Sequence, residues 1–185
     1  AIPGKRGAME NWGLITYAED LLVFDPKTIN ADSKYWAFNI IAHEIAHQWF
    51  GNLVTMSWWD TLWLNESFAS WMAVKTTTAL MPQFNAELRN IADREEAMNQ
   101  DVLKSAQPVE RPVVRDAAAF ASFDRISYNK GQAVLNMIEN FVGERNWRDG
   151  IEAYMRHYQY SNTVSDDLWR AIEVAAPGKD VRAFA

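Results

Sequence analysis

Two histidines and a glutamate at the spacing of metal ligands are the first residues of this sequence that could do chemistry. His43, Glu44 and His47 stand in the stretch HEIAHQWFGN, with the histidines four residues apart. On a helix this spacing puts two imidazoles on one face, where they can hold one metal ion while Glu44 lies beside a water on that ion. The alternative is a pair of ordinary core histidines. An H-E-x-x-H pattern arises by chance in roughly one chain of this size in a few hundred, so the pattern indicates a metal site.

A third metal ligand has to come from elsewhere in the chain. A catalytic zinc ion takes three protein ligands and keeps one open position. The sequence has no cysteine, so the third ligand must be a histidine or a carboxylate. Glu66, in WLNESFASW, lies among large apolar residues, where an unpaired carboxylate would be costly to bury. We therefore predict Glu66 as the third ligand; the alternative is a glutamate stabilised by the dipole of a helix N-terminus.

The elements that must position these residues are mostly helical. Residues 12–24 are rich in β-branched and aromatic side chains and predict one or two strands. The stretch VTMSWWDTLW is expected to be a connection, with Trp58 and Trp59 in packing rather than in a ligand site. Apolar periodicity and stop signals predict helices over about 33–49, 64–80, 83–99, 127–142 and 146–160, and a last one capped by Ser165. The expected fold class is α+β, mainly α, with a β edge at about 1–30 and a helical body at about 33–185.

Composition excludes several classes of function. The chain has 185 residues, 49% of them apolar, which is enough to bury a core. Its net charge of -6 and scattered basic residues exclude a nucleic-acid partner. The absence of cysteine excludes disulfides, thiolate metal sites and cysteine nucleophiles, and with the acidic balance it favours a cytoplasmic enzyme. Because the apolar runs are far shorter than about 18 residues, no membrane segment is expected.

Three motifs together resemble one enzyme family. HEIAHQWFGNLVT and then WLNES, with eighteen residues between His47 and Glu66, resemble the gluzincin signature H-E-x-x-H-x18-E of the M1 zinc aminopeptidases, which include aminopeptidase N. A second motif of that family, GAMEN, is intact at Gly7 to Asn11. The third, an aromatic hydroxyl before K-G, is Tyr128 in ISYNKG. The motifs stand in the family's order, and the resemblance extends over nearly the whole chain.

The resemblance implies a mechanism for these residues. One Zn²⁺ per chain would be held by His43, His47 and Glu66, with one position left for water. Glu44 would take the proton from that water and pass it to the departing amine. The Tyr128 hydroxyl would stabilise the charge that develops on the carbonyl oxygen, an effect of about 3 kcal/mol for such donors.

The same resemblance places the substrate on the GAMEN segment. Glu10 would pair with the free α-ammonium of a peptide, so that only the first peptide bond reaches the metal. Gly7 and Ala8 would pair with the substrate main chain as an added strand, and Met9 would line the pocket for the first side chain. Asn11 completes the motif. The implied partners are therefore peptides with a free N-terminus.

The resemblance also implies a larger protein. Members of the family carry a β-rich domain before the catalytic domain and a helical domain after it, and the preceding domain adds a further glutamate at the α-amine. The chain corresponds to a partial thermolysin-like catalytic domain, 1–185, with its flanking domains expected elsewhere. Two residues depart from the family pattern: Ser67 stands where many relatives have glycine, and Ala73 where many have glutamate, so the hydrogen-bond partner of a zinc histidine differs here.

Alternative functions remain within and outside this chemistry. One is the bifunctional epoxide hydrolase and aminopeptidase branch of the family, whose members tend to have a second glycine where Ala8 stands. A thermolysin-type endopeptidase would have no use for GAMEN. Outside this chemistry, the chain could be a zinc-binding domain that has no catalytic activity. The intact Glu44 argues against this alternative.

Overall fold

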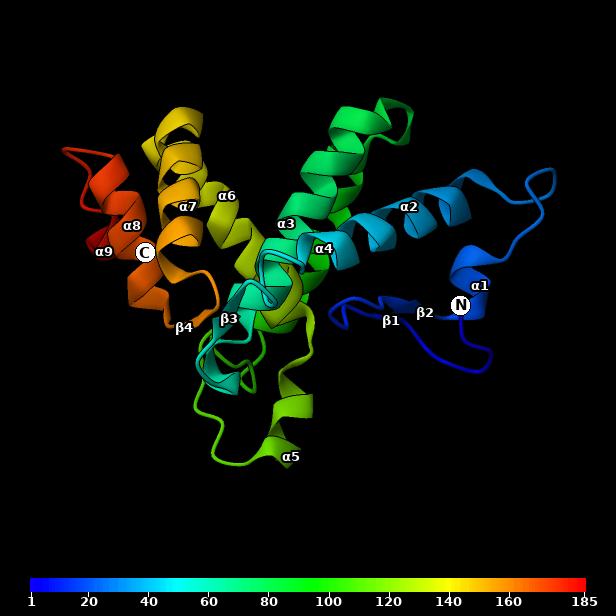
Figure 1. Cartoon of the computed structure of the whole chain (residues 1–185), viewed down its shortest axis with the longest axis horizontal. Helices are drawn as coiled ribbons and strands as arrows, with labels where there is room; N and C mark the ends of the chain where they lie inside the picture. Colours follow the sequence, from blue (N-terminus) through cyan, green and yellow to red (C-terminus); the bar gives the residue numbers. More distant parts are fainter.

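The protein is mainly helical, with four short strands, in a computed structural model that describes all 185 residues. The two termini lie at opposite ends of its longest axis (Figure 1). Two helices, α2 (Ala31–Ala46) and α3 (Trp63–Leu80), meet at the centre of the molecule. The remaining longer helices are α4 (Ala86–Asp101), α6 (Gly131–Val142), α7 (Glu144–Tyr158) and α8 (Ser165–Ala175). The α+β, mainly helical class is confirmed.

The β edge at the N-terminus is shorter than the sequence indicated. Strand β1 (Ala8–Met9) pairs antiparallel with β2 (Thr16–Tyr17), with Ala8 opposite Tyr17. The prediction of strand over 12–24 holds only for β2 and is wrong for Glu19–Leu22, which forms the short helix α1. Glu19 and Asp20 in its first turn are stabilised by the positive end of the helix dipole, which competes with the strand preference of the apolar residues.

The motif HEIAH lies at the C-terminal end of α2, with His43 to Ala46 in the helix and His47 at its C-cap. The helix begins at Ala31, slightly before the expected start, because the Asn30 side chain accepts the N–H of Ser33 at 2.8 Å and caps it. It ends before the expected residue 49, and the chain then turns at Gly51, whose φ of +126° favours glycine. The helix prediction for 64–80 agrees with α3, and that for 83–99 lies within three residues of α4 at either end.

The C-terminal half packs a core of helices against α3. Its centre is a cluster of large buried side chains that includes Phe68, Trp71, Leu135 and Trp147. The helix expected over 127–142 consists of a π-helical turn, Ile126–Lys130, followed by α6. The prediction of Ser165 as N-cap is wrong by one residue: Ser165 is the first residue of α8, and the Asp167 carboxylate accepts the N–H of Val164 at 3.0 Å.

Several short elements could not be predicted from periodicity. Strand β3 (Val54–Met56) lies in the stretch expected to be a connection and pairs parallel with β4 (Ser161–Thr163). The short helices α5 (Asp116–Ala119) and α9 (Val181–Phe184) were not predicted either. Segments of three or four residues carry too little of a repeat to be assigned from sequence.

Glycine at the crossing of α7 and α8 gives a first stability prediction. A Cβ at Gly150 would lie 2.8 Å from the Cα of Ile172, which is backbone and cannot move aside. We expect Gly150→Ala to destabilise the protein by about 1–3 kcal/mol because the two helices must separate. Urea unfolding followed by circular dichroism measures this, with Arg148→Ala on the exposed face as the control. An unchanged midpoint for Gly150→Ala would show that the helices do not pack this closely.

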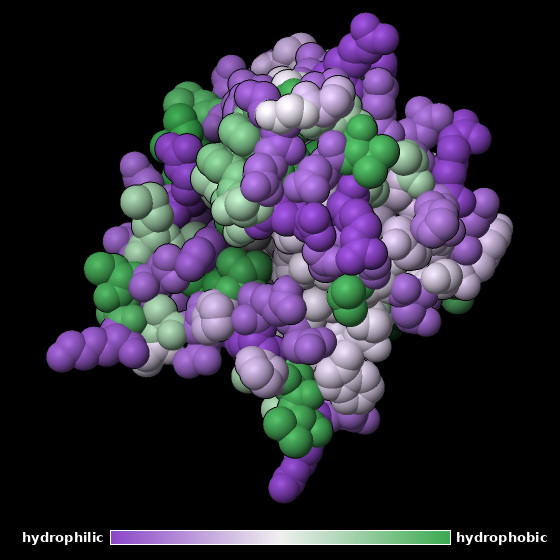
Figure 2. Space-filling view, turned by 90° about the vertical axis from the view of Figure 1, so that its left-hand side faces the viewer, coloured by the Kyte–Doolittle hydropathy of each residue, from purple (hydrophilic) through white to green (hydrophobic).

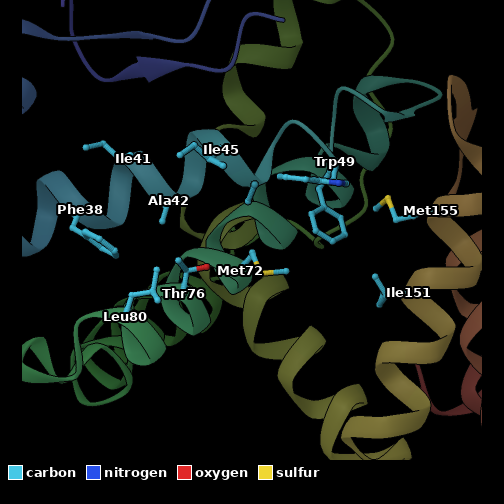
Figure 3. A pocket seen from close by; sticks show the side chains of 12 residues that line it. Phe38, Ile41, Ala42, Ile45, Trp49, Met72, Thr76, Leu80, Ile151 and Met155 are labelled. Atoms are coloured by element: carbon cyan, nitrogen blue, oxygen red, sulfur yellow. The ribbon is translucent and has the colours of Figure 1, made fainter. Parts of the chain in front are cut away.

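An apolar groove runs between α2, α3 and α7. Its lining includes Phe38, Ile41 and Ile45 of α2 and Met72 and Leu80 of α3, with α7 at one end (Figure 3). Its volume is about 580 Å³, and it has no titratable or metal-ligating side chain in its lining. By contrast, the face that includes the C-terminal helices is mostly hydrophilic with smaller apolar patches (Figure 2). None of the helices has the length and apolar character needed to span a membrane.

Candidate active site

Three of the predicted residues converge where α2 meets α3. The Nε2 atoms of His43 and His47 lie 3.0 Å apart, and the Oε2 atom of Glu66 lies 3.3 Å from the first and 3.4 Å from the second. His47 is 1% exposed and Glu66 is 4% exposed. The crossing of α2 and α3 thus brings two imidazoles and one carboxylate to a single point.

The spacing of these atoms fits a zinc ion. In a tetrahedral site with bonds of about 2.0–2.1 Å to nitrogen and oxygen, ligand atoms lie about 3.3 Å from one another. The ligand atoms of His43, His47 and Glu66 all lie within 4.8 Å of one another, and no other group of three or more such side chains occurs in the structure. Two neutral imidazoles and a carboxylate are also the donors that zinc accepts when one position is left open.

Hydrogen bonds at the far side of the imidazoles orient them toward this point. The Nδ1 atom of His47 lies 2.9 Å from the carbonyl oxygen of Phe50 and donates to it, so Nε2 is the nitrogen that faces the cluster and would bind a metal. The Nδ1 atom of His43 lies 3.4 Å from Oγ of Ser70. Ser70 is thus a partner of His43 that the sequence analysis did not identify.

Electrostatics in the cluster reflect burial and mutual attraction. Burial lowers the pKa of His43. For His47, burial acts in the same direction, but the hydrogen bond and charge of Glu66 outweigh it and raise the pKa to about 9. Burial would raise the pKa of Glu66, yet the hydrogen bonds from the two histidines lower it to about 2. The carboxylate is therefore ionised and available as a ligand.

Glu44 and Tyr128 face the cluster from two elements. Glu44 is 6% exposed, and its Oε2 atom is buried without a hydrogen-bond partner. Burial raises the pKa of Glu44 to about 7, and the charges of Glu10 and Glu66 add to the shift. Tyr128 lies on the π-helical turn, with its ring stacked on that of His43 at a centroid distance of 6.0 Å. Burial and the charge of Glu66 raise the pKa of the phenol, so its hydroxyl keeps its proton.

Two cavities open on either side of these residues and share His43, Glu44 and Tyr128 in their lining. The first, of about 470 Å³, also contains Met9 and Glu10. The second, of about 560 Å³, contains Gly7. Ala8 borders both. Four of the five predicted substrate-binding residues, Gly7 to Glu10, therefore line one or both of these cavities.

Asn11, the fifth of these residues, does not line either cavity. Its side-chain amide donates to Oγ1 of Thr16 at 3.3 Å, across the turn between β1 and β2. Trp58 and Trp59, which were expected to pack, line the cavity that contains Glu10; Trp58 is 44% exposed and donates from Nε1 to the carbonyl of Val113 at 2.6 Å. The sequence signal that could have pointed to this cavity wall was the pair of adjacent tryptophans in a stretch predicted to be a connection.

Two further residues missed in the sequence hold Glu10 in place. The side-chain amides of Asn52 and Gln48 donate to the backbone carbonyl of Glu10 at 2.9 Å and 3.4 Å. Gln48 lies four residues after Glu44, just beyond the C-terminal end of α2, so its position near the site could be inferred from the spacing of the predicted helix. Asn52 lies in the turn after α2, and only the folded chain shows its contact with β1.

Comparison with known proteins decides the family. The model of the peptidase family M1 domain matches residues 4–185. The chain belongs to peptidase family M1. Its relatives include endoplasmic reticulum aminopeptidase 2 of Homo sapiens, which is 46% identical over 175 residues, or 93% of this chain and 18% of that protein.

Relatives from distant organisms show the same degree of similarity. Probable aminopeptidase 1 of Saccharolobus solfataricus is 44% identical over 92% of this chain and 22% of that protein. Aminopeptidase M1 of Arabidopsis thaliana is 40% identical over 95% of this chain and 20% of that protein. The M1 chain described here spans about a fifth of the length of these curated relatives.

Proposed function

We propose that this M1 chain is the thermolysin-like catalytic part of a zinc-dependent aminopeptidase, which removes N-terminal residues from peptides. The observation that carries the proposal is the cluster of His43, His47 and Glu66 at distances that suit zinc, with Glu44 and Tyr128 facing it. The names of the relatives, which are aminopeptidases, support the same reaction. The chain spans only about a fifth of the length of these relatives, and flanking domains would complete the substrate site.

A Zn²⁺ ion held by His43, His47 and Glu66 would supply a Lewis acid and lower the pKa of a water molecule. Glu44 lies next to His43 on the same helix and lines both cavities, so its carboxylate is placed to accept the proton of the attacking water. Its buried Oε2 atom has no protein partner, which leaves it free for this transfer. The protonated carboxyl then donates to the departing amine.

Tyr128 would act on the other side of the peptide bond. Its hydroxyl stays protonated and can donate to the carbonyl oxygen as negative charge develops there. A donor held before the reaction begins stabilises the transition state without reorganisation, which makes the position of the phenol important.

Glu10 would set the register of the substrate. Glu10 lines the cavity that contains the cluster, whereas Gly7 lines the second cavity, and the Glu10 carboxylate can pair with the α-ammonium of the first residue. The residue after the scissile bond then extends along Ala8 and Gly7. A peptide without a free ammonium loses this anchor, which favours an exopeptidase over an endopeptidase.

The test compares alanyl p-nitroanilide with its N-acetylated form, with one equivalent of zinc, in the wild type and in Glu10→Gln. We expect hydrolysis of the free substrate only, and a loss of about 10- to 150-fold in kcat/KM for Glu10→Gln, the range for a charge-assisted hydrogen bond of about 1.5–3 kcal/mol. Equal hydrolysis of both substrates would refute the exopeptidase assignment. Zinc binding without hydrolysis of either substrate would favour a zinc-binding domain that lacks a complete site.

A further inference from the structure

The buried hydroxyl of Ser67 joins the segment that carries Glu66, the proposed third metal ligand, to the segment that carries the Tyr128 phenol. Ser67 follows Glu66 on α3, and Ser127 precedes Tyr128 on the π-helical turn. Oγ of Ser67 donates to the backbone carbonyl of Ser127 at 2.5 Å. Both serines are buried, with exposed fractions of 0% and 1%. The hydrogen bond therefore links the neighbours of two site residues directly, away from water.

The close approach of the two segments depends on a glycine. A Cβ at Gly131, the first residue of α6, would lie 1.9 Å from Oγ of Ser67 and 3.0 Å from its Cβ. Gly131 thus leaves the space that the Ser67 hydroxyl occupies. Any side chain at position 131 would push this hydroxyl away from the carbonyl of Ser127.

The other contacts of the π-helical turn hold its ends. The Asp124 carboxylate accepts the N–H groups of Ile126 and Ser127 at 3.1 Å each, and Lys130 donates to Asp101 at 2.8 Å. These contacts come from the preceding loop and from α4. Two side chains of α3 act on this turn: Ser67 donates to the backbone carbonyl of Ser127, and Glu66 acts on the Tyr128 phenol through a hydrogen bond and its charge.

A π-helical turn needs such support. The i→i+5 pattern is rare and occurs mostly as single turns inside α-helices, often at functional sites. Here the N–H of Gly131 bonds to the carbonyl of Ile126, five residues earlier. Relaxation to a regular helix would rotate the residues of the turn about the axis and move the phenol of Tyr128 relative to His43.

We propose that Ser67 is a positioning residue, whose hydroxyl holds the π-helical turn against α3 so that the Tyr128 phenol stays opposite the cluster of His43, His47 and Glu66. This role rests on the proposed function, since it acts through the oxyanion donor. It differs from a packing role because its effect on the reaction must pass through Tyr128.

A double-mutant cycle tests this role. We expect Ser67→Ala to lower kcat for alanyl p-nitroanilide by about 10-fold with little change in KM, a part of the roughly 100- to 1,000-fold cost of losing an oxyanion donor. In a Tyr128→Phe background the same substitution should change kcat by less than about 2-fold. An equal decrease in both backgrounds, or none in the wild type, would overturn the proposal.

Two further variants separate this effect from misfolding. Gly131→Ala leaves Ser67 in place but displaces its hydroxyl, and should lower kcat in the same way as Ser67→Ala. Thr77→Val removes another buried hydroxyl of α3, which bonds to the carbonyl of Ala73 at 2.7 Å, and should leave kcat unchanged. A normal kcat for Gly131→Ala would contradict the proposed role of the Ser67 hydroxyl.

A measurement that does not depend on enzyme activity separates the test of the Ser67 role from the test of the proposed function. With 3-fluorotyrosine at position 128, we expect one sharp ¹⁹F resonance in the wild type and a shifted or broadened resonance in Ser67→Ala, with one zinc per chain in both. An unchanged resonance would overturn the positioning role even in an active enzyme. If the wild type does not hydrolyse peptides, the proposed function fails while the resonance still tests the contact.

Discussion

Glu44→Gln is expected to lower kcat for alanyl p-nitroanilide by about 100- to 10,000-fold, the contribution of a positioned general base. The amide has nearly the same shape as the carboxylate but cannot accept a proton from water. Because Glu44 is not one of the three clustered ligands, zinc content should stay at one per chain. Stopped assays at saturating substrate, with metal content measured on the same samples, would show both effects.

A second buried glutamate provides the matched control for Glu44. Glu139 accepts hydrogen bonds from Lys75 at 2.7 Å and from Trp71 at 3.1 Å, outside both cavities at the cluster. Glu139→Gln should weaken the fold but leave kcat unchanged in the folded fraction. If Glu44→Gln retained full kcat with zinc bound, the proton would have to be accepted by another group, and the proposed mechanism would be wrong.

Glu66→Gln is expected to have its largest effect on the metal itself. The substitution removes the only negative charge among the three ligands and leaves two imidazoles with a neutral amide. Loss of a supporting hydrogen bond costs metal sites roughly 10- to 100-fold in affinity, so loss of a ligand should cost more than about 100-fold. Competition with a chromophoric zinc chelator measures the affinity, and activity should fall in parallel and return in part at high zinc concentration.

The third histidine of the chain is the control for this measurement. His157 lies on α7 outside the cluster, so His157→Gln should leave zinc affinity unchanged. An equal loss in both variants would point to nonspecific binding by histidines. Unchanged affinity in Glu66→Gln alone would show that Glu66 is not a ligand, and the alternative of a glutamate stabilised by the helix dipole would then stand.

The sequence alone placed the residues whose relation is local. His43 and His47 could be assigned to one helix face, with Glu44 beside them, because the helical repeat is fixed and no tertiary contact is needed to bring them together. The absence of cysteine limited the third ligand to a histidine or a carboxylate, and apolar periodicity located the long helices that carry the site. The three motifs were sufficient to indicate the family that the comparisons then established.

The tertiary structure decided everything that depends on how separate segments meet. The crossing of α2 and α3 brings Glu66 to the two histidines, and the contacts of Asn52 and Gln48 bring Glu10 to the same cavity. The strands β3 and β4 form only because distant segments pair, and the π-helical turn at Tyr128 has no periodic signature. The hydrogen bond from Ser67 and the space left by Gly131 could not be predicted from the sequence either. A contact between buried groups depends on the packing of the whole core and not on the local helical repeat.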